Sequence, residues 1–98
     1  MIIVAGHILI KPEKYTDAVA AMSAMATETQ KEEGCVTYQF YEDITTPNRF
    51  VVYEIWESAE TLKAHGESAH MAEFRKLIPD AVAAPPDIRR YKAEEIKS

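Results

Sequence analysis

Hydrophobic and polar positions follow strand-like and helix-like patterns in turn along this chain. Three runs are rich in β-branched and aromatic residues and have the length of β-strands, over residues 1–10, 35–43 and 50–57. Turn-forming residues at 45–48 separate the second run from the third. These two runs therefore predict a β-hairpin.

The segment between the first two runs has the periodicity of a helix. Apolar side chains recur there at intervals of three or four residues, as on one face of an amphipathic helix: Tyr15, Val19, Met22 and Ala26. Pro12 suits the entry of this helix, where its missing N–H costs nothing, and Gly34 suits its end. The pattern predicts a helix over residues 13–32.

Two shorter helices and a last strand are predicted in the second half of the chain. Ser58 can cap a helix that Gly66 then breaks, and Ser68 can cap another helix over residues 69–78. The remaining segments are a predicted loop, a strand with a weak signal and a polar tail, over residues 80–87, 88–92 and 93–98.

The order of these elements predicts a single domain over residues 1–98 of the α+β class. Strand, helix, strand, strand, helices and strand form the ferredoxin-like split βαββαβ arrangement with an antiparallel sheet, in which helices cover one face only. Apolar side chains of the third run nevertheless point to both faces: Val51, Tyr53 and Ile55 to one, and Phe50, Val52 and Trp56 to the other. A monomer would leave one apolar face in water, so we expect a homodimer that packs sheet against sheet.

Charge and composition limit the partners. The 98 residues carry a net charge of −5 without a lysine or arginine cluster, which argues against nucleic acid. The sequence has no apolar stretch of the roughly 18 residues that a membrane helix needs. The first ten residues lack a basic leader, and the single cysteine, Cys35, agrees with a reducing compartment, so we expect a cytoplasmic protein. A small molecule or a second protein chain is the expected partner.

Candidate chemistry is concentrated in residues 54–71, which contain the only tryptophan and two of the three histidines. Glu54 and Trp56 are two residues apart on a strand and therefore share a face. His65 and His70 are five apart and would diverge by about 140° on one continuous helix, so their spacing does not predict a metal site. The break at Gly66 could still bring both imidazoles to one cavity, where one of them could act as a general base.

Structural roles remain open for each of these residues. Glu54 could lie at a rim in an ion pair, Trp56 could belong to the core, and each histidine could cap a helix or lie on the surface. His7, inside the first run, could be a structural histidine with a backbone partner. The sequence has no glycine-rich phosphate loop, nucleophile elbow or CxxC motif, so flavin, nicotinamide and nucleotide have no predicted site.

Several segments resemble the antibiotic biosynthesis monooxygenase family, particularly its quinol monooxygenase branch: EEGC at 32–35, EIWES at 54–58, and KAH followed by SAHM up to residue 71. The resemblance implies a dimeric α+β barrel that oxidises quinols or polycyclic phenols with molecular oxygen and without metal, flavin or haem. It also implies a pocket between the helices and one face of the sheet. His7 matches a position of the first strand at the border of that pocket, where other branches carry asparagine or glutamate.

Oxidation of a phenol without a cofactor needs a base and a dry pocket, and this chemistry suggests roles for individual residues. We expect His65 to be the catalytic base, with His7 or Glu54 orienting it or sharing the proton. An apolar slot for a flat ring is expected from five further side chains: Tyr38, Trp56, His70, Met71 and Phe74. No cofactor and no metal ion are expected.

Two other classes of function remain open. The same histidines could serve an isomerase or another proton-transfer enzyme that acts on a small, phosphosugar-like carbonyl compound. The protein could also be a non-catalytic, stress-associated dimer whose pocket binds a ligand without turnover. Oxygen consumption in the presence of a quinol would distinguish a monooxygenase from both alternatives.

Overall fold

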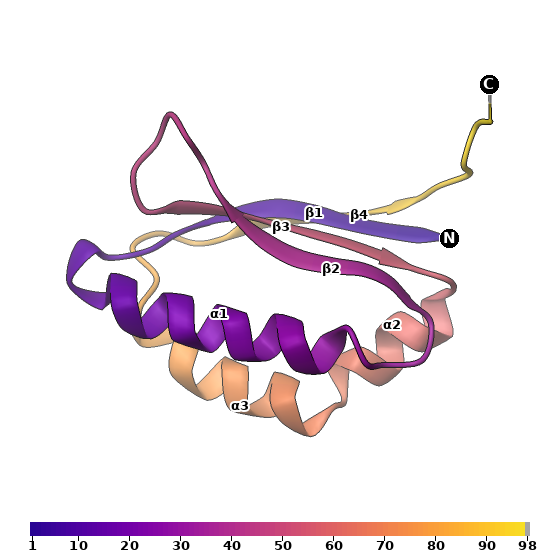
Figure 1. Ribbon diagram of the computed structural model, residues 1–98, viewed down its shortest axis with the longest axis horizontal. Helices are drawn as coiled ribbons and strands as arrows, with labels where there is room; N and C mark the ends of the chain where they lie inside the picture. Colours follow the sequence, from indigo (N-terminus) through magenta and orange to yellow (C-terminus); the bar gives the residue numbers. More distant parts are fainter. Residues whose placement is uncertain (98) are drawn as a thin grey trace.

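The computed structural model describes residues 1–97, and it contains a four-stranded antiparallel sheet with helices packed on one side (Figure 1). The α+β, ferredoxin-like arrangement predicted from the sequence is confirmed. The strands and α-helices, in chain order, are β1 (Ile2–Leu9), α1 (Tyr15–Thr29), β2 (Cys35–Glu42), β3 (Arg49–Trp56), α2 (Ala59–Gly66), α3 (Ala69–Leu77) and β4 (Asp87–Lys92). No helix within residues 1–97 has the length and apolar character needed to cross a membrane.

The predicted helices differ from the observed ones at their ends. The helix expected over 13–32 begins as a 3-10 turn at Pro12–Lys14, and its α-helical part ends at Thr29. The chain turns at once, and the Glu32 N–H donates to the Thr29 carbonyl at 2.9 Å. The third helix ends at Leu77 because a second 3-10 turn, Ile78–Asp80, accommodates the proline ring.

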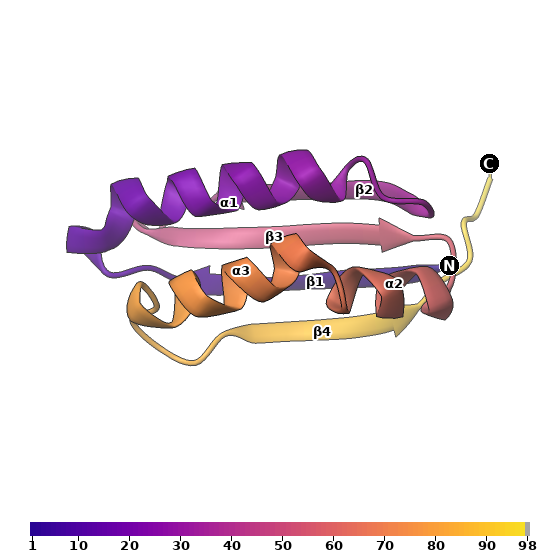
Figure 2. The same ribbon diagram turned by 90° about the horizontal axis from the view of Figure 1, so that it is seen from below.

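The sheet has the order β2-β3-β1-β4, so β3 and β1 lie in its centre (Figure 2). Val4 lies opposite Glu54 and Ile2 opposite Trp56, which gives these residues a common face. Every second residue of β3 is buried on that face, beneath the helices. The core formed there includes Val4, Ile8, Met22, Met25, Phe50, Val52 and Trp56.

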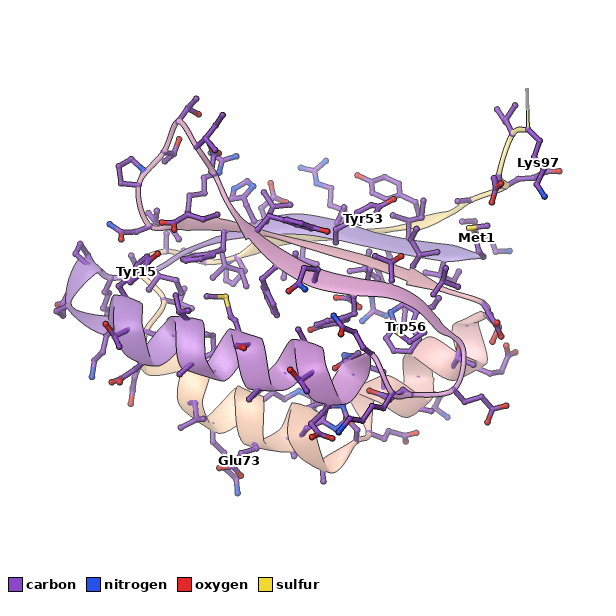
Figure 3. The ribbon with its side chains drawn as sticks, in the orientation of Figure 1. Met1, Tyr15, Tyr53, Trp56, Glu73 and Lys97 are labelled. Atoms are coloured by element: carbon purple, nitrogen blue, oxygen red, sulfur yellow. The ribbon has the colours of Figure 1, made fainter. Side chains whose placement is uncertain are left out.

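The opposite face of the sheet carries no helix (Figure 1). Side chains of intermediate exposure cover its two central strands: Ile3, Ala5, His7 and Leu9 of β1, and Val51, Tyr53 and Ile55 of β3. Figure 3 shows Tyr53 on this side and Trp56 on the helical side. The prediction that β3 has two apolar faces is therefore confirmed, whereas the dimer that it suggested remains a prediction.

Candidate active site

A tight turn after α1 directs Glu32 toward the other helices. Gly34 ends this turn with a φ of 81°, in the left-handed region that glycine adopts without a steric penalty. A Cβ atom at Gly34 would lie 2.3 Å from the Thr61 side chain of α2, so the turn and the helix pack too closely for any other residue. The Glu57 N–H also donates to the Gly34 carbonyl at 2.9 Å, which fixes the turn to the end of β3.

The corner between α2 and α3 brings two histidines together. Ser68 caps α3 by accepting from the Met71 N–H at 3.2 Å, and its hydroxyl donates to the carbonyl of His65 at 2.7 Å. Arg75 of α3 donates to the Gly66 carbonyl at 2.8 Å, which satisfies an acceptor at the end of α2. The two helices therefore meet at a corner, and the rings of His65 and His70 lie 5.9 Å apart.

One oxygen of Glu32 contacts both histidines. Oε2 lies 2.8 Å from Nδ1 of His65 and 2.7 Å from Nε2 of His70. A carboxylate only accepts hydrogen bonds, so these contacts assign a hydrogen to Nδ1 of His65 and to Nε2 of His70. The His65 side chain is 4% exposed, that of Glu32 16% and that of His70 24%, so the group extends from the interior to the surface.

An aromatic wall surrounds the buried end of this group. The Trp56 ring stacks at a tilt on His65, with centroids 4.9 Å apart, and the Tyr38 ring lies 5.4 Å from the same imidazole. Trp56 Nε1 donates to Glu54 Oε1 at 2.9 Å, which confirms that Glu54 and Trp56 lie side by side. Burial raises the pKa of Glu54 and of the Tyr38 phenol, because the charged form of each loses its hydration.

Tyr38, Trp56 and His70 of the expected slot have their rings next to His65, but the slot residues are packed into the core. Trp56 has no exposed surface, and Phe74 is buried against Phe40 with ring centroids 6.0 Å apart. Met71 is partly buried against the same core. None of the slot residues lines the groove of about 500 Å³ between α2 and β4, whose wall includes Ile2, Leu62, Lys63, Gly66, Arg90 and Lys92.

The expectation that His7 and His65 border one pocket is wrong within this chain. His7 pairs with Val51 and therefore lies on the face of the sheet that has no helices. Its Nδ1 lies 3.4 Å from a terminal nitrogen of Arg49, a side-chain partner rather than the backbone partner considered from the sequence. The sequence was ambiguous here because β1 is apolar on both faces, so its alternation did not assign His7 to a side.

Glu32 is the site residue that the sequence analysis missed. It lies 33 residues before His65 and 38 before His70, so no local spacing connects the three. Two weaker signals were present. The EEGC segment was part of the family resemblance, and Gly34 marked a tight turn immediately after the acidic pair.

Comparison with known proteins agrees with the fold. The family model for antibiotic biosynthesis monooxygenase matches residues 1–77. The chain belongs to this family.

Individual relatives cover nearly all of the chain. YcnE of Bacillus subtilis, named as a candidate monooxygenase, is 30% identical over 95 residues, which are 97% of this chain and 100% of YcnE. Protein sll1783 of Synechocystis, which is uncharacterised, is 35% identical over 97 residues, and the match spans 99% of this chain and 66% of that protein. The crystal structure of a conserved protein from Methanosarcina mazei superposes with a TM-score of 0.90 at 28% identity, covering 95% of this chain and 92% of the other.

The raised pKa of Glu54 predicts how stability depends on pH. Glu54 contributes stability that is present below the ordinary glutamate pKa of about 4.3 and is lost as pH rises through its higher folded value. Glu54→Gln keeps an oxygen for the Trp56 N–H and removes the buried charge. Thermal unfolding of Glu54→Gln should give a higher midpoint than that of wild type at pH 7, and the difference should shrink toward pH 4.

Glu57→Gln, at an exposed neighbour, is the control and should leave the midpoint unchanged. A lower midpoint for Glu54→Gln at pH 7 would show that the fold needs this charge.

Proposed function

We propose that this protein is a cofactor-independent monooxygenase that oxidises a small quinol or related phenol with molecular oxygen. Membership of the antibiotic biosynthesis monooxygenase family supports a small-molecule oxidation. The observation that carries the proposal is the contact between Glu32 and His65 beside the buried Trp56. It provides an oriented imidazole in surroundings with little water, which are the requirements for forming a phenolate near neutral pH.

His65 is the proposed base. A phenol has a pKa near 10, and its anion gives an electron to oxygen far more readily than the neutral form. Glu32 holds Nδ1, which leaves Nε2 of His65 as the nitrogen that accepts the substrate proton. The carboxylate also stabilises the imidazolium that results, as the orienting acid does in a catalytic triad.

His70 supports the carboxylate that orients the base. Its Nε2 donates to the same Glu32 oxygen from the more exposed side, so the carboxylate has a second hydrogen-bond donor besides His65. We propose that His70 positions Glu32, whereas the sequence predicted a role for it in lining the pocket. Trp56 and Tyr38, which lie against the His65 ring, would form a wall that excludes water from it.

The oxygen step needs no other electron source. A naphthohydroquinone-type substrate and one O₂ would give a hydroxynaphthoquinone and one water: the four electrons that reduce O₂ come from the substrate, and one oxygen atom enters the ring. Two-electron oxidation would instead give a quinone and hydrogen peroxide. We propose that the substrate reaches His65 from the groove between α2 and β4, where Gly66 follows the base in the chain.

The basic rim of this groove favours a second candidate function. Lys63, Arg90 and Lys92 line it together with Glu67, and this excess of positive charge suits a phosphorylated or carboxylated substrate. The same base could then isomerise an anionic carbonyl compound by proton transfer without using oxygen. An oxygen electrode distinguishes the two: hydroquinones, naphthols and anthrones are offered to the protein, and the proposed monooxygenase consumes oxygen with at least one of them.

Replacement of the base and of its partner tests the mechanism. His65→Asn should lower turnover by roughly 10²–10⁴-fold, the usual contribution of a general base, while the variant stays folded at the assay temperature. The loss should shrink as pH approaches the phenol's own pKa, because solvent then makes the anion. Glu32→Gln should also lower turnover, whereas Glu33→Gln, at the exposed neighbouring glutamate, should not. Unchanged turnover at pH 7 in His65→Asn would show that this histidine is structural.

We further propose that the protein is a homodimer. The face of the sheet without helices carries Ile3, Leu9, Val51, Tyr53 and Ile55, all of intermediate exposure, and a soluble monomer rarely exposes so continuous an apolar surface. A second copy that packs on this face would bury it symmetrically.

Size exclusion with light scattering tests the dimer. At micromolar concentration the mass should be twice the 11.1 kDa of one chain. Tyr53→Lys would place a charge in the middle of the proposed interface and should shift the protein toward the monomer. A wild-type monomer that binds no hydrophobic dye would contradict the proposal.

A further inference from the structure

We propose that Glu32, His65 and His70 form a binding site for a divalent first-row transition metal, for which Zn²⁺ is the reference. One ligand atom from each residue lies within 4.8 Å of the other two: a carboxylate oxygen of Glu32 and a ring nitrogen of each histidine. The three residues come from the turn after α1, the end of α2 and the start of α3. The fold brings them together, and no local sequence motif contains all three.

The donor set selects the class of metal. Two imidazole nitrogens and one carboxylate oxygen suit Zn²⁺, Co²⁺, Ni²⁺ and Cu²⁺, whereas Mg²⁺ and Ca²⁺ prefer oxygen ligands alone. Three protein ligands leave at least one coordination position for water or another small ligand. This is the open type of site, not the closed four-ligand type that only stabilises a fold.

Binding of an ion requires the ligand atoms, which now lie within 4.8 Å of one another, to adjust to a common coordination distance. Glu32 Oε2 now lies 2.7 Å and 2.8 Å from the two nitrogens, in hydrogen bonds. Around an ion held at about 2.0–2.1 Å by each ligand in a tetrahedron, these separations become about 3.3 Å. The metal would replace the two hydrogens that the carboxylate now accepts. Glu32 lies in a turn outside the helices, so its side chain can make this adjustment.

Neighbouring contacts hold the ligands in place. The Ser68 hydroxyl donates to the carbonyl of His65, and Arg75 donates to that of Gly66, so two hydrogen bonds support the corner that carries both histidines. Such support is what keeps metal ligands oriented in established sites. His70, the most exposed of the three, offers the ion a path from solvent, whereas His65 forms the buried end.

Metal binding would have a consequence for catalysis, which rests on the proposed function. An ion on Nδ1 of neutral His65 requires the ring hydrogen to be on Nε2, the nitrogen that the mechanism needs free. The metal-bound protein could therefore not accept the substrate proton at His65. Zn²⁺ should act as an inhibitor of the proposed reaction.

Calorimetric titration of the chelator-treated full chain tests the site without any turnover. ZnCl₂ should bind at one ion per chain, and MgCl₂ should not bind. Glu32→Gln and His70→Gln should each weaken Zn²⁺ binding by at least about tenfold. Glu33→Gln and His7→Gln, which change an adjacent glutamate and the remaining histidine, should bind as wild type does.

A measurement on the wild-type chain covers the case in which a variant fails to fold. Co²⁺ added to wild type should give visible absorption bands of a nitrogen- and oxygen-ligated ion, and Zn²⁺ should abolish them. Absence of Zn²⁺ binding to wild type would overturn the proposal. Binding that persists in folded Glu32→Gln and His70→Gln would also overturn it, because the ion would then lie elsewhere. Neither result bears on oxygen consumption, so the proposed function is decided separately.

Discussion

The contact of one glutamate oxygen with two imidazoles is the interaction on which the candidate site depends. Glu32 belongs to the first βαβ half of the chain, and His65 and His70 belong to the second half. The carboxylate therefore ties the turn after α1 to the corner between α2 and α3. Gly34 makes the approach possible, because any larger residue would collide with Thr61. The same contact orients the proposed base and assembles the proposed metal ligands.

Burial gives these polar groups their chemical character. A charge removed from water costs free energy unless it has a partner, and the two glutamates of this region differ in their partners. Glu32 has two imidazole partners and reaches solvent beside His70, whereas Glu54 has the Trp56 N–H and a raised pKa. The helical side of the sheet thus holds a polar cluster inside an aromatic shell. The central strands of the other side carry mainly apolar side chains, with His7 and Arg49 among them. The candidate site and the proposed dimer surface therefore lie on opposite faces of β3.

The sequence predicted the order of elements because each signal there is local. Residue patterns of period two and of three to four, capping serines and helix-ending glycines each act within a few positions. The shared face of Glu54 and Trp56 followed from strand geometry in the same way. The end of α1 at Thr29 did not, since the turn that ends it is stabilised by packing on α2.

Patterns that act over a few residues could not predict which side chains meet at the site. The spacing of five between His65 and His70 argued against a shared ligand only on a continuous helix, and the Ser68 corner removes that premise. Glu32 is distant in sequence and converges on them through tertiary packing alone. His7 was assigned to the pocket by family resemblance, and strand register places it on the opposite face.

The tautomers of His65 and His70 test the central claim most directly. Long-range ¹H–¹⁵N spectra of the imidazoles at neutral pH distinguish hydrogen on Nδ1 from hydrogen on Nε2 and detect N–H protons that exchange slowly. The Glu32 contacts predict hydrogen on Nδ1 of His65 and on Nε2 of His70, with both slow protons lost in Glu32→Gln. A His65 ring with its hydrogen on Nε2, unchanged in Glu32→Gln, would contradict the account.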